Sequence, residues 1–141
     1  MSEDRRSYVG EGDRRAGSLD GIWRMDWGVA RSDESGFGGI PFTLLVRRRR
    51  ACGIDQRGVL LTAVFGQQTD DIVEIIAWVE PAIVDVSLLL RPTDGIYVRQ
   101  AQSYRGRLTV LRAGNLPVLA GLVSHGGDVF NVRLEMTGAL P

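Results

Sequence analysis

Two carboxylates interrupt strongly apolar stretches and are the first candidates for chemistry. Glu74 lies within IVEIIAWV (residues 72–79), and Asp85 lies within AIVDVSLLL (residues 82–90). A carboxyl group that faces an apolar interior has a raised pKa, so it could act as an acid, as a base or as an anchor for a ligand. On the opposite face of the same segments, either carboxylate would be solvated. The sequence leaves both orientations open.

The chain has one histidine and one cysteine, and neither has the companions of a catalytic or metal site. His125 follows Ser124, and adjacent side chains of an extended chain point apart, so the two do not form a dyad. A zinc site needs about four ligands with characteristic spacing. Cys52 lies beside a run of arginines, which would favour its thiolate form. We expect a turn histidine, a loop cysteine, no catalytic residue, no metal and no cofactor.

Arg47, Arg48, Arg49 and Arg50 form an uninterrupted basic run, with Arg57 close behind. Guanidinium groups pair bidentately with carboxylates and phosphates, so the run is a candidate contact for an acidic partner. A solvated strand end, protected by its charge from edge-to-edge aggregation, would give the same pattern. The run contains no aromatic side chain on which a base could stack, and the formal net charge is zero. We therefore expect no nucleic-acid binding.

The segment LDGIWRMDWGVA (residues 19–30) predicts the strand against which the other strands close. Trp23, Met25, Trp27 and Val29 alternate with the side chains of the other face, which is typical of a half-buried strand. We interpret Trp23 and Trp27 as the floor of a closed sheet or the lining of a cavity within it.

Turn-rich clusters separate further apolar or alternating stretches. We predict a loop over residues 49–57 and strands over residues 40–48, 59–65, 72–79, 82–90, 96–104, 108–112, 116–123 and 129–137. A single helix over residues 70–82 is the alternative in the middle of the chain, but Pro81 and the density of β-branched residues favour two strands. Trp78 then joins Glu74 and Asp85 as a candidate lining residue of a cavity.

These strands predict an all-β fold, an antiparallel eight- or nine-stranded barrel with a two-sheet sandwich as the alternative. Residues 1–18 are charged and glycine-rich and predict a flexible tail, and residues 19–141 predict a single domain. No apolar run has the roughly 18 residues of a membrane span. With a single cysteine and no secretory signal, the chain is expected to be cytoplasmic.

The order Gly21-Ile22-Trp23 at the start of the first strand resembles the calycin superfamily of lipocalin-like barrels. The resemblance implies that Trp23 closes the barrel base and that a basic residue near the C-terminus, here Arg133, packs across it. The alternation of the last strand instead points Arg133 away from Val132 and Leu134. The opening LDGIW also resembles the small lipocalin-like negative regulators of type III secretion, which implies a short cytoplasmic barrel that binds a partner protein.

We expect a non-enzymatic binding protein, a small cytoplasmic regulator that acts through protein–protein contact. The first alternative is a carrier of a small hydrophobic ligand, or a barrel isomerase or cyclase that uses Glu74 or Asp85. The second alternative is a subunit of a larger assembly, because residues 72–90 carry more apolar surface than a barrel with one buried face requires. A homo-oligomer would cover that surface equally well.

Overall fold

A computed structural model of the protein describes residues 18–30, 36–81, 89–91, 96–98, 101–113 and 116–140. All regular structure in these residues is β-structure, as the sequence predicts. The strands are β1 (Gly21–Val29), β2 (Phe42–Arg47), β3 (Arg50–Ile54), β4 (Val59–Gln68), β5 (Ile72–Pro81), β6 (Leu89–Arg91), β7 (Ile96–Val98), β8 (Gln102–Ala113), β9 (Leu116–His125) and β10 (Asp128–Gly138).

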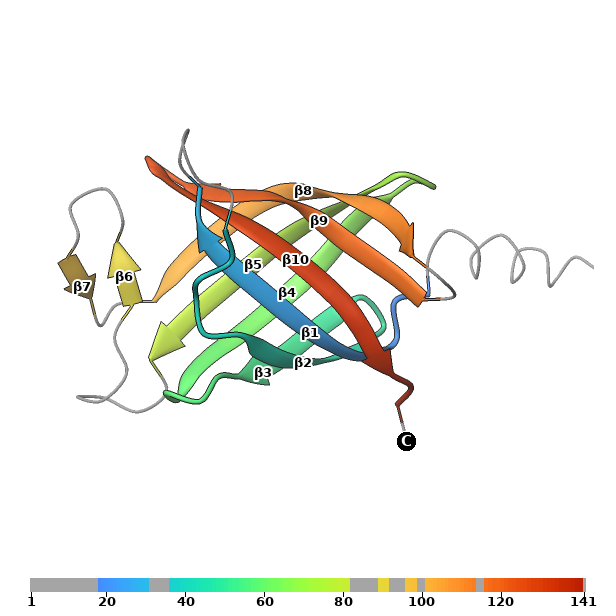
Figure 1. The fold of residues 1–141 in the computed structure, drawn as a ribbon, viewed down its shortest axis with the longest axis horizontal. Coiled ribbons are helices and arrows are strands. Elements are labelled where there is room, and N and C mark those ends of the chain that lie inside the picture. The colour runs from blue at the N-terminus through green and yellow to red at the C-terminus, as the bar shows by residue number, and fades with distance from the viewer. Residues whose placement is uncertain are drawn as a thin grey trace, which may run out of the picture.

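Eight of these strands form a closed antiparallel barrel in the order β1-β10-β9-β8-β5-β4-β3-β2 (Figure 1). Sequence neighbours pair throughout, except that β5 pairs directly with β8 and that β1 pairs with β10 to close the barrel. The short strands β6 and β7 pair with each other outside the barrel, beyond the end at which β5 finishes. The predicted barrel is therefore confirmed, and it has the architecture that the calycin resemblance implies.

Two of the predicted boundaries are wrong. Residues 49–57, predicted as a loop, contain β3, which the sequence hides because Ala51 is the only buried side chain in the strand. The predicted strands over 96–104 and 108–112 are instead the short β7 and the long, continuous β8. Of the predicted strand over 82–90, residues 82–88 lie outside the described residues.

Strand β5 excludes the helical alternative for its part of the chain. Its buried residues are Val73, Ile75 and Ala77, which alternate with the outward-facing side chains of Glu74 and Trp78. Both faces of the strand are apolar in sequence. The inward face is the one that carries Val73, Ile75, Ala77 and Val79.

The interior is packed unequally along the barrel axis. At the end where β1 begins, Trp23 is almost fully buried and its Nε1–H donates to the Leu19 carbonyl at 2.8 Å. Side chains with no exposed surface, such as Val46, Leu108 and Leu134, fill the interior around it. Trp23 therefore lies at the filled end of the barrel. The opposite end, where β1 finishes, is not filled.

No helix among the described residues is long and apolar enough to cross a membrane. Of residues 1–18, predicted as a flexible tail, residues 1–17 lie outside the described residues.

Candidate functional site

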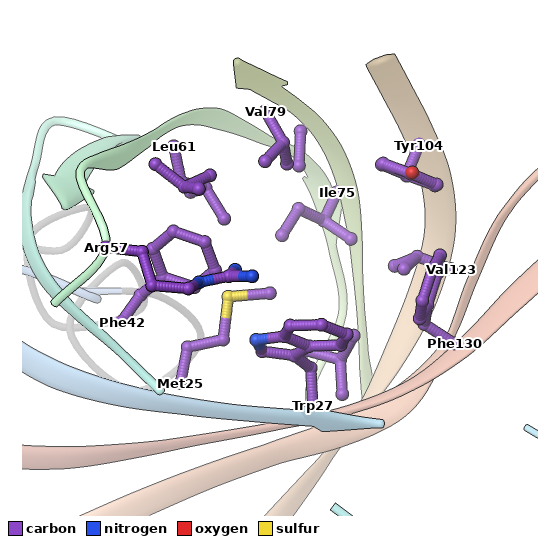
Figure 2. A pocket seen from close by; sticks show the side chains of 13 residues that line it. Met25, Trp27, Phe42, Arg57, Leu61, Ile75, Val79, Tyr104, Val123 and Phe130 are labelled. Carbon is purple, nitrogen blue, oxygen red and sulfur yellow. The ribbon is translucent and has the colours of Figure 1, made fainter. Parts of the chain in front are cut away.

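The unfilled end of the barrel holds a cavity of about 70 Å³. Its lining comes from seven strands and the turn between β3 and β4, and Figure 2 shows the side chains directed toward its centre. Among the side chains that line the cavity, those of Trp27, Arg57 and Tyr104 carry polar groups. The lining residues are Met25, Trp27, Phe42, Arg57, Val59, Leu61, Ile75, Ala77, Val79, Tyr104, Val123, Phe130 and Val132.

Trp27 forms one wall and is fixed by the segment that leads into β2. Its Nε1–H donates to the Ile40 carbonyl at 2.7 Å, and its own carbonyl accepts from the Gly39 backbone N–H at 2.8 Å. Gly39 lies directly against the indole, where a Cβ atom would overlap the ring. Because its N–H is already satisfied by the protein, Trp27 offers an apolar surface to the cavity.

Aromatic rings from four strands continue this wall around the barrel end. Trp27 meets Phe130 edge-to-face, with ring centroids 5.5 Å apart, and Phe130 meets Tyr104 in the same way at 5.3 Å. The His125 ring lies 6.2 Å from Tyr104, beside the β9–β10 turn. Edge-to-face pairs are favourable because the positive ring edge faces the negative ring face. The row gives this end of the cavity an aromatic wall.

Arg57 brings a cation to the apolar lining, and Asp55 fixes its position. The Asp55 side chain is completely buried, and its Oδ2 accepts from Arg57 Nη2 at 2.9 Å and from Arg57 Nε at 3.1 Å. Its Oδ1 accepts from the backbone N–H groups of Arg57 and Val59. Figure 2 shows the Arg57 side chain extending across the ring of apolar residues. One carboxylate thus shapes the β3–β4 turn and positions the guanidinium.

Tyr104 supplies the second polar group and remains protonated. Burial, with a smaller effect from the nearby Asp128 carboxylate, raises the pKa of Tyr104 to about 12. Both effects disfavour the phenolate. At neutral pH the hydroxyl is therefore a neutral donor and acceptor, and Arg57 is the only charged side chain among the lining residues.

The structure separates the residues that the sequence proposed as cavity lining. Trp27 lines the cavity, whereas Trp23 lies at the filled end. Glu74 and Trp78 project from the outer surface, because Val73, Ile75, Ala77 and Val79 take the inward positions of β5. Glu74 is 3.7 Å from Arg107 in an exposed ion pair. Asp85 lies outside the described residues.

In the basic run of residues 47–50, some arginines contribute to the fold and others are exposed on the surface. Arg48 and Arg49 form the two-residue turn between β2 and β3, and the Arg48 backbone N–H donates to Asp20 at 2.9 Å. The Arg49 guanidinium donates to the Phe65 and Gly66 carbonyls and to Gln68, where the β4–β5 register shifts. Its side chain is therefore committed to the fold. Arg47 and Arg50 face each other across the strands and are exposed.

Three further sequence candidates lie on the outer surface. Arg133 is 3.4 Å from Glu135 on the outward face of β10, so it does not pack across Trp23 inside the barrel. Cys52 is an exposed free thiol on the outer face of β3. His125 is exposed at the end of β9. Among the described residues, no group of three or more His, Cys, Asp or Glu side chains could hold a metal ion.

Arg57, Asp55 and Tyr104 are the residues of this site that sequence reasoning missed. The run Asp55-Gln56-Arg57-Gly58 is a turn signal, since Asp commonly accepts hydrogen bonds from the backbone two residues on and Gly supplies positive φ. Gly58 has φ 85°. That signal locates the turn, but the direction of Arg57 into the barrel depends on closure of the sheet.

Comparison of the chain with protein-family models, with curated protein sequences and with solved structures gives no significant match.

Proposed function

We propose that this chain is a binding protein that takes a small, mainly apolar ligand into the open end of its barrel. The observation that carries the proposal is the cavity walled by Trp27, Phe130 and Tyr104 at one end of an otherwise filled interior. Side chains of barrels this size can fill the interior or leave room for one small ligand. The unequal packing supports the second arrangement at this end only.

The size of the cavity sets the class of ligand. A volume of about 70 Å³ accepts a short alkyl group and is well below the roughly 300–1,000 Å³ of sites for drug-sized ligands. A longer ligand needs the Arg57 side chain to swing outward. That side chain is 30% exposed and belongs to a turn, but its outward movement breaks the ion pair with the buried Asp55 carboxylate, so a longer ligand binds only at the cost of leaving that charge unpaired. A ligand with an anionic end would keep its charge beside Arg57.

The test is a titration with a chain-length series of alkanoates and the matching alcohols. Tryptophan fluorescence is followed in a Trp78→Phe background, which removes the exposed indole and leaves Trp27 as the reporter at the cavity. Saturable changes that strengthen with chain length and then level off are expected. A response linear in concentration at every chain length contradicts the proposal.

A matched pair of variants locates the binding. Ala77→Leu places extra methyl groups in the cavity and is expected to abolish the response. Ala120→Leu makes the same change on the outward face of β9, opposite Thr109 and Arg133, and is expected to leave it unchanged. Equal binding by both variants would place the ligand elsewhere.

We propose contact with another protein as a second function, in the manner of the small cytoplasmic lipocalin-like regulators that residues 19–23 resemble. The observation that favours it is the exposure of Trp78, 43% accessible on the outside of the barrel. Aromatic side chains are enriched where proteins meet. Capture of a partner that is lost on replacement of outward-facing residues would support this function. A single exposed cysteine suits a reducing compartment such as the cytoplasm.

A further inference from the structure

We propose that the outer surface of β2–β5 is a docking face for an acidic amphipathic helix of a partner protein. This inference rests on the second proposed function and is independent of any ligand in the cavity. The face is a continuous group of outward-pointing side chains, called here the outer face: Leu45, Cys52, Ile54, Leu60, Thr62, Val64, Ile76 and Trp78.

The strand register makes these residues neighbours. Leu45, Cys52, Thr62 and Trp78 are successive register partners on β2, β3, β4 and β5. Ile54 pairs with Leu60 on one side of this row, and Val64 pairs with Ile76 on the other. Leu45 and Ile54 are each 50% exposed. These apolar side chains therefore form one contiguous exposed patch and are not scattered singly over the surface.

Arginines border one side of the outer face. Arg50 is the register partner of Val64, Arg47 is the partner of Arg50, and Arg105 is the partner of Ile76. Like charges directly opposite each other, as at Arg47 and Arg50, are unfavourable within a sheet. In the described part of the chain no carboxylate forms an ion pair with these three arginines. Carboxylates of a partner would supply the missing counter-charge.

The extent of the outer face favours a single segment over a second barrel. Four strands spaced about 4.8 Å apart give a width of about 15 Å, and three rows of side chains give a similar length, or about 200 Å² in plan. A stable interface between two globular partners takes roughly 800 Å² from each. One amphipathic segment with apolar anchors and flanking carboxylates matches the smaller area.

Because the barrel is closed, we infer that the docking segment of the partner is a helix. Each of the eight barrel strands is paired on both sides, so no edge of the barrel is open to an added strand. The segment must dock through side chains. A helix presents apolar residues at positions i, i+3, i+4 and i+7 on one face and can carry acidic residues along its flank.

Cys52 provides a built-in probe, because it is the single cysteine of the chain and lies within the outer face. The probe ligand is a synthetic amphipathic helix of about 18 residues, with leucine on one face and glutamate elsewhere. Its binding is measured by fluorescence anisotropy, and alkylation of the Cys52 thiol by iodoacetamide is timed in parallel. With nine-tenths of the protein bound, the alkylation rate is expected to fall about tenfold by mass action.

Variants and a charge-reversed peptide give the controls. Trp78→Ser and the double change Arg47→Gln with Arg50→Gln are each expected to weaken binding at least about fivefold, as loss of an aromatic or arginine anchor does. Leu122→Ser removes an equally exposed leucine from β9, across the barrel from β3, and should change nothing. The same helix with lysine in place of glutamate should bind far more weakly. Circular dichroism of each variant checks the fold.

Four results would overturn the docking face. The first is that the acidic helix binds without slowing the alkylation of Cys52, and the second is that the acidic and basic helices bind equally well. The third is that phosphatidylserine vesicles protect Cys52 from alkylation whereas the acidic helix does not. The fourth is that light scattering shows a dimer that accounts for slow alkylation. A protein captured equally by the original chain and by Trp78→Ser would also overturn this surface, while leaving the second proposed function standing. If Trp78→Ser loses both the captured protein and the acidic helix, the result supports the docking face and the second proposed function.

Discussion

Asp55 and Arg57 form an ion pair, 2.9 Å between Oδ2 and Nη2, that joins the β3–β4 turn to the mouth of the barrel cavity. The carboxylate has no exposed surface, while the guanidinium side chain is partly exposed. Four donors converge on the two Asp55 oxygens, two from the Arg57 side chain and two from backbone N–H groups. Folding of the turn and placement of the cation therefore depend on one buried group.

Removing that carboxylate should cost substantial stability. Asp55→Ala leaves two backbone N–H groups and a guanidinium without their acceptor, and such losses cost about 2–4 kcal/mol. The free energy of unfolding from urea titration measures the effect. Asp26→Ala is the matched control, since Asp26 pairs with Arg24 at 3.0 Å on the surface, and exposed pairs contribute about 0–1 kcal/mol. Equal losses in the two variants would contradict the structural role of Asp55.

Truncation of two tryptophans should change the free energy of unfolding by very different amounts. Trp23 is 1% exposed and Trp78 is 43% exposed. Trp23→Ala leaves a large cavity at the filled end of the barrel and should reduce the free energy of unfolding by about 3–5 kcal/mol. Trp78→Ala, on the surface, should change it by about 0.5 kcal/mol. A large loss in Trp78→Ala would mean that the outer face is covered within the folded chain.

The period-two alternation around Trp23 and Trp27 predicted the buried face of β1, and the series of strands separated by turn clusters predicted the barrel, with a sandwich as the alternative. For strand β5, the alternation does not predict which face is buried. Ile72, Glu74, Ile76 and Trp78 share one face, which the sequence identifies, but the opposite face is apolar as well. Which face turns inward depends on the side chains that the neighbouring strands contribute. The cavity role considered for Trp78 and Glu74 could not be settled from β5 alone.

The candidate site was less predictable than the fold, because its polar groups are brought together by closure of the sheet. Asp55 and Arg57 belong to a turn, and Tyr104 lies far along the chain in β8. None of them interrupts an apolar pattern in a way that marks a site. The strand β3 that precedes the turn was itself hidden, since a two-residue turn of Arg48 and Arg49 lacks the glycine or asparagine that commonly marks a hairpin.

That turn yields a pair of opposite predictions. Arg48 and Arg49 have φ of 53° and 66°, a left-handed conformation that is unfavourable for arginine. Arg48→Asn keeps the backbone hydrogen bond to Asp20 and should stabilise the protein by about 0.5–1 kcal/mol. Arg49→Asn has the same backbone benefit but loses the contacts with the Phe65 and Gly66 carbonyls, so it should destabilise by about 1 kcal/mol. Thermal unfolding of both variants measures the difference, and a gain in stability from both would show that the Arg49 contacts contribute little.

Ionisation of Tyr104 should make the stability of the protein depend on pH. Its pKa in the folded protein is about 12, above the ordinary value of 10.0, because burial and Asp128 oppose the phenolate. A group whose folded pKa is raised contributes stability that is fully present below pH 10 and is lost as the pH rises toward about 12. Allowing for screening by solvent, the loss should be about 1–2 kcal/mol.

The measurement compares the free energy of unfolding between pH 9 and about 12 in the original chain and in Tyr104→Phe. Because phenylalanine has no ionisable group, the variant should lack this part of the pH dependence while keeping its ring between Phe130 and His125. Ultraviolet titration of the folded protein should show a tyrosine component with a midpoint near 12 that disappears in the variant. If all tyrosine absorbance instead titrates near 10, the Tyr104 hydroxyl is open to solvent and the aromatic wall of the cavity is looser than the ring contacts indicate.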